Sequence, residues 1–232
     1  MATYVLVHGS YQGGWIWQRV ADRLRAQGHK VYAPSLDGCG ERKGSVRPGI
    51  TTETHADEVA QLLFYEDLKD VVLVGTSSGG MVVCRVAELM RERIGRLAFI
   101  DALALLDGEK IGDIVTRSTA AVVPGGLTRG PSREDAATRL FADLDPQTRA
   151  WALERYTPHP AGIYEHGVRL DSFWSQSWPG TLVVWCRRAQ NPGEAHQRRA
   201  AERLHAKWAE LDTGHYPMLS MPEELTQLLV AG

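Results

Sequence analysis

The chain has 232 residues, of which 44% are hydrophobic and 23% are charged, and its formal net charge is −2. This composition excludes a disordered chain and a disulfide-stapled miniprotein, and the small net charge supplies no basic field for nucleic acid. Three cysteines, an odd number without paired spacing, favour a reducing compartment and no structural zinc. The N-terminus lacks a leader pattern, and no apolar run is long enough to span a bilayer. We therefore predict a soluble, cytoplasmic protein without nucleic acid or membrane partners, with a homodimer as the candidate assembly.

The first hundred residues alternate between predicted strands and predicted helices. Residues 3–10 form an apolar run that ends in a glycine turn, and residues 14–28 repeat apolar side chains at helical spacing as far as Gly28. A second short strand runs into the turn residues of KVYAPSLDGCG. The segments that follow are a helix at 53–68, a strand at 71–74, a helix at 79–93 and a strand at 96–100. This order predicts an α/β fold with a mostly parallel central sheet and helices on both faces.

The alternation fails between residues 107 and 178. PSREDAATRLFADLDPQTRAWALERY predicts two short helices broken at Pro146, and the next segment is rich in aromatic residues and prolines. Strand and helix resume at 181–186 and 194–207, and AKWAELDTGHYPML gives a last strand and loop. We predict a core made of residues 1–106 and 179–232, interrupted by a helical cap insertion at 107–178 that is longer than an ordinary connection.

A serine stands on a tight turn between the strand at 71–74 and the helix that follows it. Gly75-Thr76-Ser77-Ser78-Gly79 matches the pattern G-x-S-x-G, which projects a nucleophile from a sharp elbow and requires almost no side chain two residues to either side. The same frame does not fit Ser78, because Thr76 would then occupy a glycine position. A phosphate loop is the alternative, but a Walker loop needs a lysine that is absent here. The pattern predicts Ser77 as a nucleophile.

A serine hydroxyl needs a base, and His215 is the best placed of eight histidines. It follows the last predicted strand in a glycine loop and precedes the C-terminal helix, so it comes late in the chain and after the serine. Five other histidines have no such context, and we predict that they face solvent or belong to the cap insertion: His55, His159, His166, His196 and His205.

Acyl transfer also needs donors for an oxyanion. The turn LVHGSYQGGW after the first strand places the backbone N–H of Ser10 beside that of Ser78, and these two groups are the predicted oxyanion hole. For His8 we expect a hydrogen-bonded core histidine that organises this turn and does not transfer protons.

With these pieces placed, the chain resembles the α/β-hydrolase superfamily, and more narrowly the branch of plant methyl-ester esterases, hydroxynitrile lyases and their small bacterial relatives. The similar stretches are VLVHGSYQGGWIW, VYAPSLDGCGER, VLVGTSSGGMV, LAFIDAL, VVWC and TGHYPMLSMPEEL. They cover both halves of the predicted sheet, while the insertion is similar only in length and helical character. The lyases of this branch have threonine and lysine where this chain has Gly9 and Tyr216, which argues against cyanohydrin chemistry.

The resemblance leaves the acid of the triad open. The family's acid lies a few residues after the strand TLVVWC, where this chain has Ala189. Asp101 is the leading candidate, because it ends the strand beside the one that carries Ser77 and because the lipase branch takes its acid from that strand. There are three alternatives. The acid could be Glu194, near the start of a helix, or Asp212, only three residues before His215 in the sequence, or the site could be a Ser–His dyad without an acid.

The resemblance and the motif together imply a serine hydrolase that needs no metal or organic cofactor. Its expected activity is that of an esterase, or of the related lactonases and thioesterases. Its predicted substrate is a small molecule, aromatic or polyketide-like, held in an apolar pocket under the insertion. The same aromatic residues could instead only pack the insertion onto the sheet. The other functions considered are a C–C bond hydrolase or cyclase on the same scaffold, and a non-hydrolytic ligand-binding protein that has lost its acid. The aromatic residues in question are Trp151, Tyr156, Tyr164, Phe173, Trp174 and Trp178.

Overall fold

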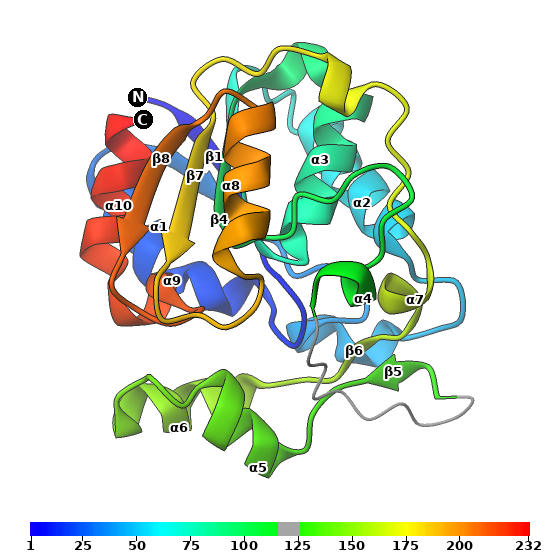
Figure 1. Ribbon diagram of the computed structural model, residues 1–232, viewed down its shortest axis with the longest axis vertical. Coiled ribbons are helices and arrows are strands. Elements are labelled where there is room, and N and C mark those ends of the chain that lie inside the picture. The colour runs from blue at the N-terminus through cyan, green and yellow to red at the C-terminus, as the bar shows by residue number, and fades with distance from the viewer. Residues whose placement is uncertain (116–125) are drawn as a thin grey trace.

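The computed structural model describes residues 1–115 and 126–232, which build one six-stranded parallel sheet with helices on both faces (Figure 1). The strand order is β2-β1-β3-β4-β7-β8, and every neighbouring pair is parallel. The α/β fold predicted from the alternation is therefore confirmed. The strands are β1 (Thr3–Val7), β2 (Lys30–Tyr32), β3 (Val71–Ser77), β4 (Ile94–Ala102), β7 (Leu182–Cys186) and β8 (Lys207–Leu211).

Helices cover the two faces of the sheet in separate groups. One face carries α1 (Gln18–Ala26), α9 (Pro217–Ser220) and α10 (Pro222–Ala231), and the other carries α2 (Thr52–Tyr65), α3 (Gly79–Leu89) and α8 (Glu194–Arg203) (Figure 1). Short 3₁₀ turns are η1 (Gly14–Trp17), η2 (Gly40–Ser45) and η3 (Arg91–Arg93). None of the helices in the described residues is both long and apolar enough to cross a membrane.

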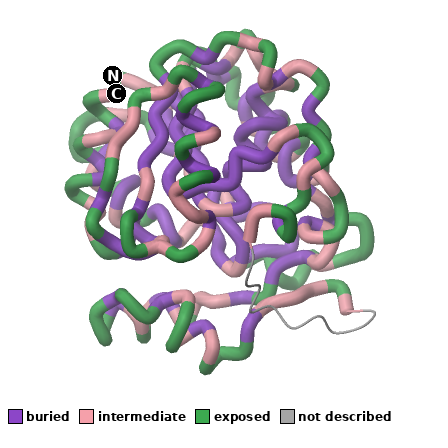
Figure 2. Tube along the Cα trace, in the orientation of Figure 1, coloured by how far each residue is buried: buried purple, intermediate pink, exposed green. Residues whose placement is uncertain are grey.

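Both faces of the strands are buried, because successive side chains point to opposite sides of a pleated strand. Leu73 belongs to the apolar cluster under α2 and α3, whereas Val72 and Val74 belong to the cluster under α1 and α10. The strands are therefore continuous apolar runs, as expected for a parallel sheet covered on both sides. Figure 2 shows this buried centre and the more exposed outer helices.

The predicted helices begin and end close to their observed positions, with physical reasons for the differences. The helix expected at 14–28 opens as the 3₁₀ turn η1 and stops before Gly28, whose φ of 83° suits a residue just past a helix end. The helix expected at 79–93 ends at Leu89. The strand expected at 96–100 is longer and includes Asp101.

Between β4 and β7 the chain forms small elements in place of another strand–helix unit. In the described residues they are α4 (Ile111–Ile114), β5 (Thr128–Arg129), α5 (Arg133–Asp135), the π-helical turn η4 (Ala136–Leu140), α6 (Pro146–Arg155), β6 (His159–Pro160), α7 (Gly162–Glu165) and η5 (Phe173–Ser175). As predicted, Pro146 separates two short helical segments, and it is the first residue of α6, where its missing N–H costs nothing. Figure 1 shows β5, β6, α5 and α6 beyond the C-terminal ends of the central strands.

Candidate active site

The turn at Ser77 has the strained geometry of a nucleophile elbow. Ser77 adopts a φ of 51°, which is rare for a residue with a side chain. A Cβ atom at Gly75 would lie 2.7 Å from a Val83 methyl, and one at Gly79 would lie 2.5 Å from the carbonyl oxygen of His8. Both glycines are therefore required by close contacts on either side of the serine, as the motif predicts.

Ser77 also lies at the N-terminal end of α3, an eleven-residue helix that begins two residues later. The free N–H groups and the positive dipole end of such a helix favour negative charge placed beside them.

A β-bulge next to the elbow places the carboxylate of Asp101. In the pairing of β3 with β4, Thr76 faces Ile100 but Ser77 faces Ala102, so Asp101 is the extra residue. Its φ of 45° departs from the strand geometry of its neighbours, and its side chain is fully buried. The bulge turns the carboxylate out of the alternating pattern of β4.

The Asp101 carboxylate lies against His215, which enters the site from the loop after β8. Asp101 Oδ2 is 2.5 Å from His215 Nδ1, and Asp101 Oδ1 accepts a hydrogen bond from the Cys186 N–H at 3.3 Å. A carboxylate only accepts hydrogen bonds, so Nδ1 carries the proton and Nε2 is left free to accept one. Burial raises the pKa of Asp101 above its usual value, and the contact with His215 opposes that rise.

The other candidate acids lie elsewhere. Glu194 begins α8 and pairs with Arg198 at 2.7 Å, and Asp212 is an exposed partner of Arg187 and Arg188. Of the three acids that the sequence offered, Asp101 is the one that contacts the His215 ring.

The turn after β1 is joined to the N-terminus of α3 by a pair of hydroxyl groups. Ser10 Oγ lies 2.9 Å from Ser78 Oγ, and both residues are buried. His8 organises the turn as predicted: its Nδ1–H donates to the Gly9 carbonyl at 2.8 Å, and its Nε2 accepts from the Leu36 N–H at 3.0 Å. Burial lowers the pKa of His8 to about 4, so the ring is neutral at neutral pH, and both of its nitrogens are occupied by these two hydrogen bonds.

The sequence matches the alpha/beta hydrolase family over residues 4–228. This chain belongs to the α/β-hydrolase family. Two curated relatives align with it over almost their whole lengths. The carbendazim-hydrolyzing esterase of Nocardioides sp. (strain SG-4G) is 29% identical, covering 100% of this chain and 99% of the relative, and methylesterase 3 of Arabidopsis thaliana is 34% identical, covering 97% and 94%.

Solved structures share the fold. An extracellular alpha/beta-hydrolase from a Paenibacillus species superimposes with a TM-score of 0.85 at 23% identity, covering 100% of this chain and 98% of that one. A methylesterase from Arabidopsis superimposes with a TM-score of 0.80 at 18% identity, again covering 100% and 98%. The chain is thus an ester-hydrolysing α/β-hydrolase of the methylesterase-like branch, as its sequence motifs indicated.

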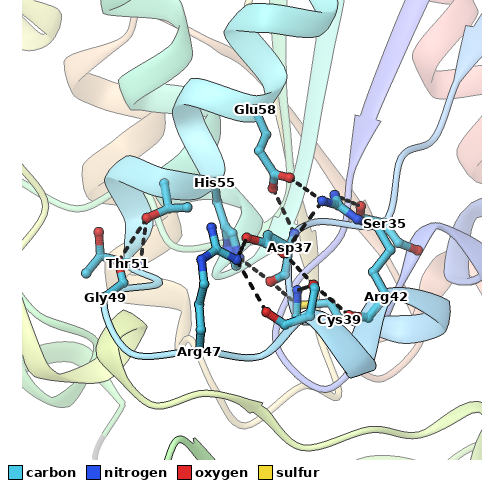
Figure 3. A network of polar contacts seen from close by, with 12 residues as sticks. Ser35, Asp37, Cys39, Arg42, Arg47, Gly49, Thr51, His55 and Glu58 are labelled. Carbon is cyan, nitrogen blue, oxygen red and sulfur yellow. Dashed lines mark hydrogen bonds and ion pairs between the residues drawn. The ribbon is translucent and has the colours of Figure 1, made fainter.

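A polar network around the buried Asp37 fixes the loop whose Leu36 N–H donates to His8 in this hydrolase. Asp37 pairs with Arg47 and, at 3.6 Å, with Arg42. From α2, Glu58 accepts the Asp37 N–H at 2.7 Å and His55 Nε2 bonds the Asp37 carbonyl oxygen at 2.9 Å (Figure 3). The network holds the loop after β2 against α2. Through the hydrogen bond from Leu36 to His8, it also holds the turn after β1.

Two of the histidines assigned to solvent are buried, so that prediction is wrong for them. His55 is 1% exposed and belongs to the network around Asp37. His196 is 7% exposed, and its Nδ1 accepts from Arg199 at 3.2 Å. Both stand on the inner faces of helices, where a neutral imidazole can be buried if a polar neighbour satisfies it.

The aromatic residues of the hydrolase insertion fall into two separate groups. Phe173, Trp174 and Trp178 lie at or near η5, which is fixed to Glu88 at the C-terminal end of α3 by the Phe173 N–H at 2.9 Å. That is the end of α3 away from Ser77. The Trp174 indole N–H donates to the Leu105 carbonyl at 3.0 Å, and all three rings pack on the core. The position of these three residues favours the alternative in which they pack the insertion onto the core and do not line a substrate pocket.

The second aromatic group lies around Tyr11, in the turn after β1 of the hydrolase. Tyr156 follows α6, donates its hydroxyl to the Pro131 carbonyl at 2.7 Å, and has its ring 5.9 Å from that of Tyr11. The ring of Tyr164 also stacks on that of Tyr11, with the ring centres 6.4 Å apart. Trp151, on α6, packs edge-on against Trp15 at 5.3 Å. Tyr156 and Tyr164 are therefore the predicted pocket residues placed beside Ser10.

Three residues near the site were not singled out from the sequence. Tyr11 follows Ser10 directly and has a φ of 69°, and Gln12 Oε1 accepts the Gly9 N–H at 3.1 Å. Asp143, in the insertion, accepts the Gly214 N–H at 2.9 Å and so fixes the loop of His215. Tyr11 and Gln12 lie within the glycine-rich turn HGSYQGGW, so the motif could have pointed to them. No sequence motif surrounds Asp143, so the sequence could not have pointed to it.

Proposed function

We propose that this hydrolase cleaves small carboxylic esters through an acyl-enzyme formed on Ser77. His215 Nε2 takes the proton of the serine hydroxyl as the serine attacks the ester carbonyl, and the protonated ring then gives a proton to the leaving alcohol. Asp101 holds the ring in the required tautomer and stabilises its positive charge. The backbone N–H groups of Ser10 and Ser78 hold the oxyanion.

The observation that carries this proposal is the 2.5 Å contact between His215 Nδ1 and Asp101 Oδ2. It supports Asp101 as the acid whose usual position is occupied by Ala189, and it favours the hydrolase over a binding protein without a complete triad. The water that hydrolyses the acyl-enzyme is activated by the same histidine, so no other base is needed.

The substrate class is the finer part of the proposal. The named substrates of the relatives are a methyl ester in one case and carbendazim in the other, and both are small molecules. Three phenol side chains, Tyr11, Tyr156 and Tyr164, lie together on the side of Ser10. Such rings support an aromatic or polyketide-like acyl or alcohol part, because flat apolar faces with polar rims suit flat, partly polar ligands.

A fluorophosphonate probe tests the reaction, because it reacts only with an activated serine. Wild type should be labelled, and Ser77→Ala should lose both labelling and about 10⁴-fold or more in kcat for p-nitrophenyl acetate. Ser78→Ala is the comparison variant and should lose far less activity, since its backbone N–H remains and only the hydroxyl contact with Ser10 is removed. Labelling of Ser77→Ala at the wild-type rate would refute the nucleophile assignment.

A further inference from the structure

Arg129 and Tyr164 are neighbouring residues of the insertion whose buried polar atoms lack partners. Arg129 lies on β5, and its guanidinium carbon is 4.6 Å from the centre of the Tyr164 ring. Within residues 1–115 and 126–232, Arg129 Nε is buried without a hydrogen bond, and the buried Tyr164 hydroxyl forms no well-aligned one, although the hydroxyls of Ser10 and Tyr11 lie near it. Buried polar atoms are almost always satisfied in folded proteins, so two adjacent exceptions indicate a place for a polar ligand.

The charge of Arg129 also lacks an ionic partner in the described part of the chain. The partly buried Arg85 and Arg199 both pair with carboxylates, whereas no carboxylate of the described residues lies within 4.0 Å of Arg129. The remaining stretch, residues 116–125, reads TRSTAAVVPG and contains no acidic side chain. A guanidinium stays protonated at every pH at which the protein is folded, so this charge persists in the site.

The charge of Arg129 lies close to the turn after β1, which carries Ser10 and Tyr11. The ring of Tyr164, which faces Arg129, also stacks on the ring of Tyr11, with an interplanar angle of 21°. Tyr11 follows Ser10, whose hydroxyl contacts that of Ser78. Arg129 is therefore linked through Tyr164 to Tyr11, the residue that follows Ser10 in the turn after β1.

The surrounding groups can donate hydrogen bonds but carry no charge that would compete with Arg129. Burial raises the pKa of Tyr11 and raises that of Tyr164 far above its usual value, so both phenols keep their protons at neutral pH. The His159 ring is 6.3 Å from Tyr11 and 6.1 Å from Tyr164. Burial holds the pKa of His159 well below its usual value, so that ring is neutral.

We propose that Arg129, together with the hydroxyls of Tyr11 and Tyr164, binds an anionic group of the substrate, such as a carboxylate. A planar carboxylate accepts hydrogen bonds at both oxygens and matches the guanidinium fork. The inference rests on the proposed ester hydrolysis and narrows its substrate class to small esters that carry a negative charge in addition to the scissile bond.

The test compares anionic esters with neutral analogues on both sides of the scissile bond. The acyl-side pair is p-nitrophenyl hydrogen glutarate and p-nitrophenyl pentanoate, and the alcohol-side pair is 4-acetoxybenzoate and 4-acetylphenyl acetate, which has a single ester bond. For each pair, the ratio of kcat/KM for the anionic ester to that for the neutral ester is measured. Because both esters see the same protein sample, any loss of folded enzyme in a variant cancels from the ratio.

Arg129→Met should lower this ratio by roughly 10- to 100-fold for at least one pair, the loss expected for a hydrogen-bonded charged contact. Arg129→Lys, which keeps the charge, should lower it less. Arg139→Met is the matched control, since Arg139 is an exposed arginine of the same insertion, 3.6 Å from Asp135. Its ratios should stay at the wild-type values.

Two outcomes overturn the inference in different ways. Wild-type ratios in Arg129→Met for both pairs would show that Arg129 does not bind the anion, while ester hydrolysis itself would stand. Failure of the wild-type enzyme to hydrolyse any of the four esters, together with no fluorophosphonate labelling, would remove the proposed function and the inference with it.

Discussion

Replacing Asp101 with asparagine tests the triad while keeping the shape of the site. Each carboxylate oxygen of Asp101 has its own donor: Oδ2 faces His215 Nδ1 at 2.5 Å, and Oδ1 accepts the Cys186 N–H at 3.3 Å. Asparagine offers one oxygen and one NH₂ group. If its oxygen serves the buried Cys186 N–H, the NH₂ group faces His215, which must then hold its proton on Nε2 and can no longer act as a base.

The size of the effect follows from the burial of Asp101, which is fully buried. Removing one partner of a buried charged pair costs about 3–5 kcal/mol. If that loss falls on the transition state, in which the imidazolium forms, kcat falls by roughly 10²- to 10⁴-fold at about 1.4 kcal/mol per factor of ten.

The assay is hydrolysis of p-nitrophenyl acetate, with KM as the internal check. KM should change little, because Asp101 is fully buried behind His215 and makes no contact that would bind an ester. Glu194→Gln and Asp212→Asn are the controls and should retain wild-type kcat. An Asp101→Asn enzyme whose kcat lies within about ten-fold of wild type would refute the reasoning.

Three further outcomes follow from packing and burial. Gly79→Ala should lower the free energy of unfolding by about 1–3 kcal/mol and reduce labelling of the elbow, because its Cβ would lie 2.5 Å from the His8 carbonyl oxygen; urea unfolding with a wild-type midpoint would contradict this. Trp174→Phe, which loses the bond to the Leu105 carbonyl, should lower the melting temperature without changing the preference between acetyl and octanoyl esters, and a changed preference would place Trp174 in the pocket. Burial raises the pKa of folded Asp101 above 3.8, so the folded state binds more protons than the unfolded state once the pH rises above that value, and wild type loses stability there. Asp101→Asn lacks this group and should therefore gain stability relative to wild type as the pH rises above 3.8; a difference that stays constant as the pH rises would disprove it.

The local sequence determined the fold class and the elbow. Alternation of apolar strands with amphipathic helices leaves a parallel sheet as the arrangement that buries both kinds of element. The pattern around Ser77 is equally local, because Ser77 itself adopts the strained φ and a Cβ at Gly75 would meet Val83 and Gly79 within the same strand–turn–helix. The contacts that exclude a Cβ at Gly79 come instead from the carbonyl oxygens of Val7 and His8 in the folded structure. His215 could be named from its place after the last strand, since carboxyl ends of parallel strands meet at one edge of the sheet.

Tertiary structure decided which side chains meet at that edge. Asp101 reaches His215 because a bulge inserts it into β4, and a bulge is set by pairing with β3 rather than by the residues of β4. Contacts between distant segments also separated the insertion's aromatic residues into two groups, since Glu88 fixes η5 at one end of α3. Arg129 gives no signal in the sequence, because a missing partner is a property of the surroundings and is defined only once the chain has folded.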